Sequence, residues 1–412
     1  MNAILDTGTA GFLARFAAIQ NRLPGDSTLR TAAADAFRTL GLPGAARGRR
    51  VEAWKYTTLQ PLGGLSFRSA EPNGAVTLPD GAARIVFSGG FYRADLSTPV
   101  PDFVRFADQP DFGELSWPDR DPIVALNTML AEDGAVLTIP SGHDAGTVFL
   151  VHAGIDGTSA HPRHTIRLGA GARLTLIETS SGDGLYLHAP VSEIHVADGA
   201  IMTHVRIQTD GIDAFHLATI YAAVAAGGTY DSFTLNAGGR LTRTEVHTAL
   251  NGAGAIAHLN AAQLLTGSQH ADFTSVVRHA APKGTSRQTV KNVLAGRSRG
   301  VFQGRIEVAR GAQGTDGYQM NRALLLSPDA EIDTKPELEI FADDVKCSHG
   351  ATIGELDAEQ LFYLRSRGIP DKEARSILVR AFLAEALDPV TNDTARGLLE
   401  DTVAHWWEGQ TL

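Results

Sequence analysis

Short segments of alternating apolar and polar residues dominate the chain from residue 80 to residue 342. The segments "TVFLVHAG", "ARLTLIETSSG" and "RLTRTEVHTAL" show this pattern, and Gly, Asp, Asn or Ser bounds most of the segments. A period of two residues is typical of a half-buried β-strand. No long amphipathic helix is predicted between them, which disfavours a doubly wound α/β fold and leaves a sandwich, a barrel or a β-solenoid.

The glycines of this region recur at a nearly constant step. Six candidate turn residues are separated by 28, 28, 27, 30 and 27 residues; they are Gly171, Gly199, Gly227, Gly254, Gly284 and Gly311. The stacked coils of a solenoid produce such a step. Because the chain contains 43 glycines, a similar spacing can also arise by chance. The periodicity therefore leaves the choice between a β-helix and a sandwich open.

Helical periodicity replaces the alternation near the N-terminus. In "STLRTAAADAFRTLGLPG", Ser27 can cap a helix that Gly41 and Pro43 end. One face of this helix is apolar and consists of Leu29, Ala32, Ala33, Ala36, Phe37 and Leu40.

The last 56 residues, 357–412, also show helical patterns. Asp357 is placed to cap a helix in "DAEQLFYLRSRG", with Gln360 at the capping-box position and Gly368 at the end. A second helix has Pro370 in its first turn and ends at Asp388-Pro389. Its predicted apolar face is Ala374, Ile377, Leu378, Ala381 and Phe382. "TARGLLEDTVAHWW" predicts a third helix.

Composition narrows the function classes. The formal net charge of −10 argues against nucleic acid as the main partner, because phosphate binding needs a basic surface. A single cysteine excludes an internal disulfide framework and suits a reducing compartment. No signal peptide is predicted, and the most apolar stretch, "ATIYAAVAAGG", is too short to span a bilayer. A cytoplasmic location is expected, and the sequence contains no P-loop, zinc-hydrolase or nucleophile-elbow motif.

The segment "DDVKCSHGAT" (343–352) contains the single cysteine and a histidine two residues later. If it is extended, Val345, Cys347 and His349 project from one face, with Cα atoms about 6.5–7 Å apart at i and i+2. A thiolate and an imidazole so placed could both contact one metal ion or small cluster. Two ligands do not complete such a site, so further ligands from elsewhere are needed. A buried cysteine beside a turn histidine is the alternative.

Seven histidines recur along the β region at spacings of mostly 9 to 12 residues: His195, His204, His216, His247, His258, His270 and His279. In a solenoid they could stack on neighbouring coils. Scattered histidines on strand faces and in turns explain the same pattern.

Two long segments resemble a known family. Residues 334–387, "TKPELEIFADDVKCSHGATIGELDAEQLFYLRSRGIPDKEARSILVRAFLAEAL", are similar to the C-terminal signature of the SufB/SufD family of the SUF iron–sulfur cluster assembly system, and residues 269–332 extend the likeness. The motif "EAWKYTTL" (52–59), the moderate length and the single cysteine indicate the SufD branch. The resemblance covers nearly the whole chain.

The resemblance implies a mainly β fold, a right-handed parallel β-helix flanked by N- and C-terminal α-helical regions. The domains expected from it are an N-terminal helical region and linker (1–80), a parallel β-helix core (81–350) and a C-terminal helical domain (351–412). It also implies a non-catalytic scaffold subunit in a complex with SufB and the SufC ATPase. A homodimer is possible when SufB is absent.

Site residues follow from the same resemblance. His349 and Cys347 match the motif implicated in binding a transient iron–sulfur cluster, or iron, at the interface with SufB. SufC docks on the C-terminal region, where our candidates are Leu361, Tyr363, Arg365 and Arg367. Two alternatives stand beside this hypothesis. A polysaccharide-active β-helix enzyme needs carboxylates and basic residues along one groove, and a purely structural partner of SufB needs no cluster ligand.

Overall fold

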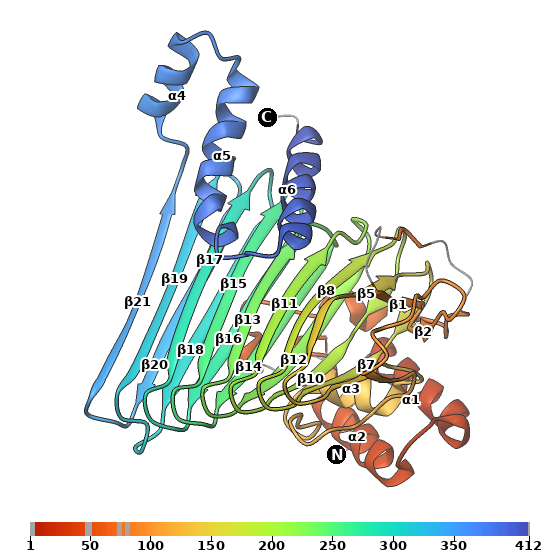
Figure 1. The fold of residues 1–412 in the computed structure, drawn as a ribbon. Coiled ribbons are helices and arrows are strands. Elements are labelled where there is room, and N and C mark those ends of the chain that lie inside the picture. Colours follow the sequence, from red (N-terminus) through yellow and green to blue (C-terminus); the bar gives the residue numbers. More distant parts are fainter. Residues whose placement is uncertain (1–4, 46–51, 72–75, 79–82, 411–412) are drawn as a thin grey trace.

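A solenoid of stacked parallel strands forms the body of this computed structural model, which describes residues 5–45, 52–71, 76–78 and 83–410 (Figure 1). The chain winds through about 8 turns, and its longer strands alternate between two sheets. Helices flank the solenoid at both ends of the chain. The predicted mainly β class, a parallel β-helix with helical regions at its ends, is confirmed.

Among the described residues, one sheet contains ten strands and is called sheet 1 below. Its strands, in spatial order, are β2 (Phe91–Tyr92), β1 (Ala83–Ser88), β5 (Asp144–Ala153), β8 (Arg173–Ser181), β11 (Ile201–Gln208), β13 (Thr229–Asn236), β15 (Ile256–Leu265), β17 (Thr285–Leu294), β19 (Thr315–Leu325) and β21 (Val345–Gly354). From β5 onward, neighbours in this sheet lie one coil apart in the sequence.

Sheet 2 contains eleven strands in the same described part of the chain. They are β20 (Glu331–Ile340), β18 (Arg299–Val308), β16 (His270–His279), β14 (Leu241–Leu250), β12 (Phe215–Val224), β10 (Val191–Val196), β7 (Arg163–Leu168), β4 (Val136–Ile139) and β3 (Arg105–Ala107), with the short strands β6 (Ser159–Ala160) and β9 (Leu187–His188) beside them.

An apolar interior lies between the two sheets. Alternate residues of each strand point inward, and the parallel register puts equivalent positions of successive coils next to each other. Ile220 of β12 is in register with Val246 of β14, and both belong to the buried cluster between the sheets. Burying a side chain of this kind contributes about 1.5–3 kcal/mol. Repetition of this contact along the coils stabilises the stack.

Four of the six predicted turn glycines occupy equivalent positions at the turn into sheet 1. Each has a positive φ and donates its backbone N–H to a carbonyl of the next coil; they are Gly171, Gly199, Gly227 and Gly254. In the next two coils Lys283 (φ 59°) and Gly314 (φ 74°) make the equivalent hydrogen bonds. The regular step is confirmed, but placing Gly284 and Gly311 at these positions is wrong. The position requires a left-handed backbone, and a lysine adopts it once.

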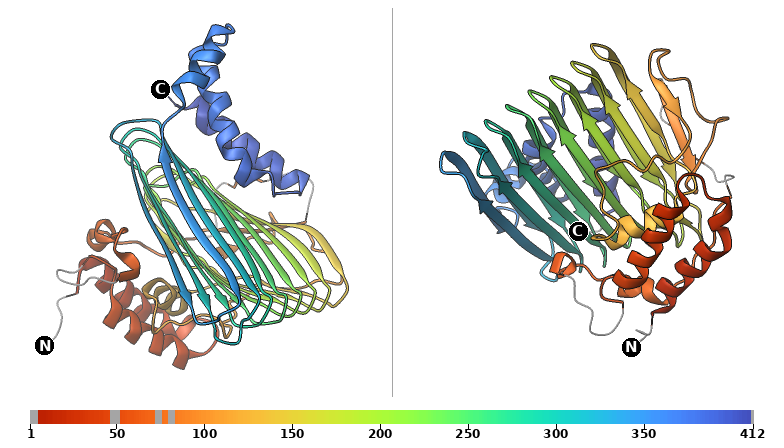
Figure 2. Two further views of the ribbon diagram at one scale, coloured as in Figure 1. Left: turned by 90° about the vertical axis from the view of Figure 1, so that its left-hand side faces the viewer. Right: turned by 90° about the horizontal axis from the view of Figure 1, so that it is seen from below.

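Helices from the first third of the chain cover the outer face of sheet 2 near β12 (Figures 1 and 2). They are α1 (Thr7–Ile19), η1 (Gln20–Arg22), α2 (Ser27–Leu40), η2 (Glu52–Trp54), η3 (Gln60–Gly64) and α3 (Pro122–Leu130). Phe37 of α2 and Leu126 of α3 are buried in one cluster with Phe215 of β12. The N-terminal helical region therefore packs on its own chain.

Two features of this region differ from the prediction. The cap of α2 is Asp26, whose side chain accepts a hydrogen bond from the Thr28 N–H at 2.7 Å, so the assignment of Ser27 as cap is wrong. The carboxylate one residue earlier reaches the free N–H groups better. Helix α3 was not predicted. All nine of its residues are buried, and a helix that is buried on every side shows no amphipathic period.

Three helices follow the solenoid: α4 (Ala358–Ser366), α5 (Asp371–Leu387) and α6 (Asp393–Glu408). Asp357 caps α4 as predicted, and Gly368 (φ 87°) follows its end. Helices α5 and α6 pack on the outer face of sheet 1, where Val379 and Leu399 join Phe233 of β13 in one buried cluster. None of the described helices is both long enough and apolar enough to cross a membrane.

The predicted apolar face of α5 is partly wrong. Ala374 is buried, whereas Ile377 is 40% exposed and Ala381 is also exposed. The buried stripe includes Val379 and Leu383 instead. The contacts of α5 with the strands beneath it determine which side of the helix is buried. One of these contacts is the ion pair between Glu385 of α5 and Lys291 of β17, at 2.5 Å.

Candidate functional site

The last coil, formed by β20 and β21, is the open end of the solenoid. Within the described residues, β20 pairs only with β18 and β21 only with β19, so each leaves one edge unpaired. Ile353 of β21 is 58% exposed, although its register partner Ala323 in β19 is 4% exposed. Phe341, directly after β20, is 65% exposed. The open end thus exposes backbone edges together with apolar side chains.

Cys347 and His349 lie on β21 at this open end. Their register partners in β19 are the buried residues Gly317 and Gln319, which face the interior of the solenoid. A Cβ at Gly317 would lie 3.4 Å from the Cys347 Sγ, so the thiol covers the glycine. Val345 and Cys347 both pack against the buried cluster that contains Ile306. The strand register therefore supports the predicted common face for Val345, Cys347 and His349.

The two predicted ligands differ in their surroundings. Cys347 is half-buried, and burial raises the pKa of its thiol, to which the nearby Asp316 carboxylate also contributes. His349 is exposed, and among the described residues its ring accepts or donates no hydrogen bond. No group of three or more His, Cys, Asp or Glu side chains in the described part of the chain could hold a metal ion. The pair is therefore an incomplete ligand set.

A second exposed surface surrounds α4. Phe362 is 72% exposed, Tyr363 56% and Ile377 40%, and they line a shallow hollow of about 830 Å³. Among the predicted docking residues, Tyr363 lines this hollow, and the Arg367 guanidinium lies 5.1 Å from its ring centroid. Arg365 pairs with Asp371 at 3.3 Å, and Leu361 is partly buried.

Sequence reasoning missed Phe362 and Ile377 on this surface. Phe362 was not chosen although it lies beside Tyr363, and Ile377 was assigned to the buried face of α5. The signal for Phe362 was its place next to the chosen Tyr363, in an α4 that buries none of its residues. Nothing in the sequence separated Ile377 from the buried residues of α5. The two predicted sites stay separate, one on β21 and the other on α4.

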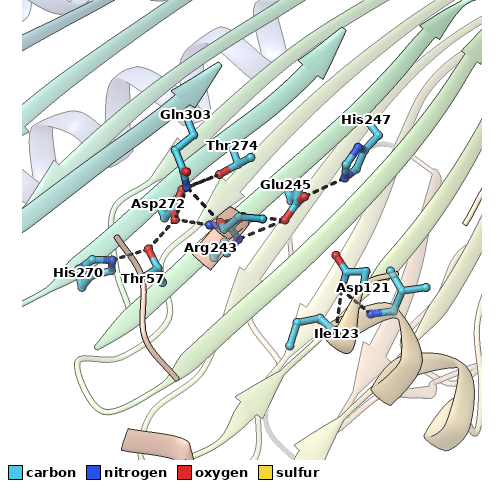
Figure 3. A network of polar contacts seen from close by, with 12 residues as sticks. Thr57, Asp121, Ile123, Arg243, Glu245, His247, His270, Asp272, Thr274 and Gln303 are labelled. Atoms are coloured by element: carbon cyan, nitrogen blue, oxygen red, sulfur yellow. Dashed lines mark hydrogen bonds and ion pairs between the residues drawn. The ribbon is translucent and has the colours of Figure 1, made fainter. Parts of the chain in front are cut away.

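The "EAWKYTTL" segment joins a polar network on the outer face of sheet 2 (Figure 3). Arg243 of β14 ion-pairs with Asp272 and, at 2.9 Å, with Glu245, and it donates to the Ala53 carbonyl at 3.0 Å. The Thr57 hydroxyl donates to Asp272 at 2.5 Å. These contacts fasten the N-terminal segment across two strands of the solenoid.

Arg243 is fully desolvated by this network. It is 1% exposed, and the Trp54 ring centroid lies 4.2 Å from its guanidinium. The Asp272 and Glu245 carboxylates outweigh the effect of burial and raise the pKa of Arg243. We call the group of Arg243, Glu245, Asp272 and Trp54 the clasp. Removing one partner of such a buried ion pair costs about 3–5 kcal/mol, so the clasp has a structural role.

Comparison with known proteins agrees with this architecture. The model of the "SUF system FeS cluster assembly, SufBD core domain" family matches residues 150–382. The iron–sulfur cluster assembly protein SufD of Escherichia coli is 32% identical, with 86% of this chain and 87% of that protein covered. The SufBD family protein slr0076 of Synechocystis is 31% identical over 91% of this chain and 90% of its own length. The chain belongs to the SufB/SufD family.

Within this family the chain is SufD-like, as its identity with the Escherichia coli SufD shows. Protein ABCI7 of the Arabidopsis thaliana chloroplast is 31% identical, over 78% of this chain and 68% of its own length. The resemblance found in the sequence is confirmed. The SufBD core match begins in β5 and ends in α5, so it includes the open end, α4 and the strand residues Arg243, Glu245 and Asp272, but not the "EAWKYTTL" segment that they hold.

The SufBD core of this chain also encloses a group of histidines that the sequence did not predict. Neighbouring rings lie 5.1, 4.9 and 4.9 Å apart along the series His164, His152, His188 and His216. His204 bonds Glu178 at 3.1 Å, and His216 bonds Asp210 at 2.9 Å. Burial lowers the pKa of His152 to about 4 and that of His164 to about 3, so both are neutral at pH 7.

Only His204 and His216 of the seven recurring histidines belong to this interior group. His247 and His270 lie on the outer face of sheet 2, in the network of Figure 3. The available signal was the phase of the alternation, because His152 and His216 share the phase of the inward apolar residues of β5 and β12. Spacing alone does not distinguish inward from outward histidines.

Proposed function

We propose that this chain is a non-catalytic scaffold subunit of a SufBCD-type complex, and that its open end binds SufB during iron–sulfur cluster assembly. The unpaired coil of β20 and β21 carries the proposal. Its backbone edges and its exposed Ile353 and Phe341 offer what a second β-helix needs to continue the stack. In the absence of SufB, a second copy of this chain can cover the same edge.

The nascent cluster is the cargo of this interface. The exposed imidazole of His349 supplies a nitrogen ligand, and the partner supplies thiolates. Cys347 is the weaker ligand of the two, because its buried thiol must first lose its proton to the incoming iron. A ligand set divided between two chains and mixing nitrogen with sulfur suits a cluster that must be released.

ATP hydrolysis belongs to the SufC partner in this proposal. The exposed hollow around Phe362 and Tyr363 is the docking surface for SufC, with Leu361, Arg365 and Arg367 around it. Helix α4, which carries this surface, projects beyond the strand ends (Figure 1). We place the complex in the cytoplasm, because a free thiol and an exposed cluster ligand suit a reducing compartment.

The test is a matched pair of histidine substitutions in the complex with SufB and SufC. After anaerobic reconstitution with iron and sulfide, we expect His349→Ala to lower the cluster content several-fold while the complex still forms. His143→Ala is the control, because His143 is also exposed but lies between β4 and β5, toward the other end of the solenoid. Pulsed electron paramagnetic resonance should detect an imidazole nitrogen coupled to the cluster in the control only.

Equal cluster content in both variants, with no nitrogen coupling in either, would contradict the ligand role. A complex that forms normally under those conditions would then support a purely structural partner of SufB.

A further inference from the structure

A groove of about 640 Å³ lies on the outer face of sheet 2, beside the clasp. Its walls include Trp54 from the N-terminal segment and Trp117 from the segment before α3, and its floor includes Tyr221 of β12 and Glu245 of β14. Asp121, the cap of α3, also lines it (Figure 3). This volume suits a small molecule. The groove is separate from Cys347, His349 and α4.

Asp121 has an unsatisfied negative charge. Only 9% of it is exposed, and its Oδ1 accepts from the Ile123 and Val124 N–H groups at 2.7 and 3.0 Å. Within the described chain, its Oδ2 accepts no hydrogen bond and the carboxylate forms no ion pair. Burial, together with the Glu245 carboxylate, raises the pKa of Asp121 to about 6.

Tyr221 presents a second unsatisfied group on the floor of the groove. It is 8% exposed and stacks on His247 at 4.8 Å between ring centroids. Among the described residues its hydroxyl has no hydrogen-bond partner. The negative charges of Asp121 and Glu245 raise its pKa further than burial alone does. Tyr221 and Asp121 both line the groove, where the hydroxyl and the free carboxylate oxygen can accept hydrogen bonds from a bound donor.

The basic residues at the mouth of the groove do not supply that donor. Lys335 pairs with Glu52 at 3.2 Å and with Glu337 at 3.2 Å, and Arg305 pairs with Glu307 at 3.0 Å. Arg120 stacks on Trp117 at 5.0 Å. Four charged or titratable side chains face Asp121: Glu245, His247, Arg243 and Tyr221. Arg278 lies at the mouth of the groove with Lys335, Arg305 and Arg120.

We propose that this groove binds a small organic cation, a guanidinium or primary ammonium compound, between Asp121, Tyr221 and Glu245. The cation donates to the free oxygen of Asp121 and to the Tyr221 hydroxyl. A metal ion is not the ligand, because the described residues contain no group of three metal-binding side chains. An anion would meet two carboxylates at the floor.

Agmatine, which carries a guanidinium and an ammonium group, is the probe. We expect calorimetry on the full chain at neutral pH to show saturable binding, accompanied by a change in tryptophan fluorescence. Asp121→Asn keeps the cap of α3 and should weaken binding about 10- to 100-fold, the loss typical of a hydrogen bond to a charged group. Tyr221→Phe should weaken it severalfold without disturbing the fold. Glu373→Gln, at an exposed position of α5, is the control.

Two further measurements test whether binding depends on charge. Lowering the pH to about 5 protonates Asp121 and should weaken agmatine binding about tenfold, since its pKa is about 6. N-butylurea is a neutral analogue of similar shape and should not compete. The proposal is overturned if agmatine shows no saturable binding up to about 10 mM, if N-butylurea binds equally well, or if correctly folded Asp121→Asn and Tyr221→Phe variants bind agmatine unchanged.

Discussion

At the N-terminal end of the solenoid each sheet finishes in a short antiparallel strand, whereas at the C-terminal end each finishes in a long parallel strand. Strand β2 has 2 residues and pairs antiparallel with β1; β3 has 3 residues and pairs antiparallel with β4. Strands β20 and β21 have 10 residues each and a free edge in the described structure. Short edge strands discourage further pairing, and long ones invite it.

The two ends of the solenoid also differ in how far their strands are buried. In β1 the last four residues, Val86 among them, are buried, although this strand is next to the end of its sheet. No residue of β21 is buried. The comparison indicates that one end of the stack is closed by its own chain and that the described residues leave the other end uncovered.

The largest expected effect concerns the closed end. Phe87 in β1 is 0% exposed and packs on the His152 and His164 rings at 5.6 and 5.2 Å. We expect Phe87→Ala to lower the free energy of unfolding by about 3–5 kcal/mol, the range for a buried phenylalanine. Ile353→Ala, at the open end, should change it by less than about 0.5 kcal/mol. Urea denaturation of the monomeric chain measures both, and equal losses would refute the difference between the ends.

The next effect is pH-dependent and comes from the interior near the closed end. His152 and His164 are neutral when folded and protonate near pH 6.5 when unfolded, so their stabilisation is complete above pH 6.5 and declines as the pH falls. For His152, whose folded pKa is about 4, the loss is about 3 kcal/mol. Asp121 and Asp133, with raised pKa values of about 6, act in the opposite direction over part of this range.

Comparing variants isolates the histidine contribution to this profile. Denaturation between about pH 6.5 and 4.5 should show a shallower loss of stability for His152→Gln than for the wild type. His349→Ala, at the exposed end, should follow the wild-type profile. If the free energy of unfolding falls equally with pH in His152→Gln and in the wild type, protonation of His152 does not contribute to the pH dependence.

The smallest effect concerns association at the open end. A lysine on an edge strand opposes strand pairing, so Ile353→Lys should weaken association with SufB or with a second copy at least tenfold, about 1.4 kcal/mol. Ile212→Lys is the matched control, because Ile212 is 73% exposed in a turn between β11 and β12. Sedimentation velocity measures both. Unchanged association of Ile353→Lys would place the partner surface elsewhere.

Much of the solenoid was predictable because its coils repeat. Alternation places apolar residues such as Ile220 between the sheets, and the glycine step follows the coil length. The sequence did not reveal that Lys283 takes the turn position of a glycine, since only the backbone dihedral decides it. Helix α3 was not predicted, because burial on all sides removes the amphipathic pattern.

The candidate sites were predictable to different degrees. Cys347 and His349 stand two residues apart on one strand, so local geometry was enough to predict their common face. The groove could not be predicted, because Trp54, Asp121 and Glu245 come from three distant segments. Among the interior histidines, His188 and His216 are register partners one coil apart, whereas the His152 ring meets the His164 and His188 rings across the space between the two sheets.

The clasp on sheet 2 has a consequence for the order of events during synthesis. Thr57 bonds Asp272, which follows it by 215 residues. At about 5–20 residues per second, the ribosome needs roughly 10–40 s to make that separation. The "EAWKYTTL" segment therefore leaves the ribosome long before its binding strands exist. Its contacts with the solenoid therefore form late, once the coils of the nascent chain are stacked as far as β16.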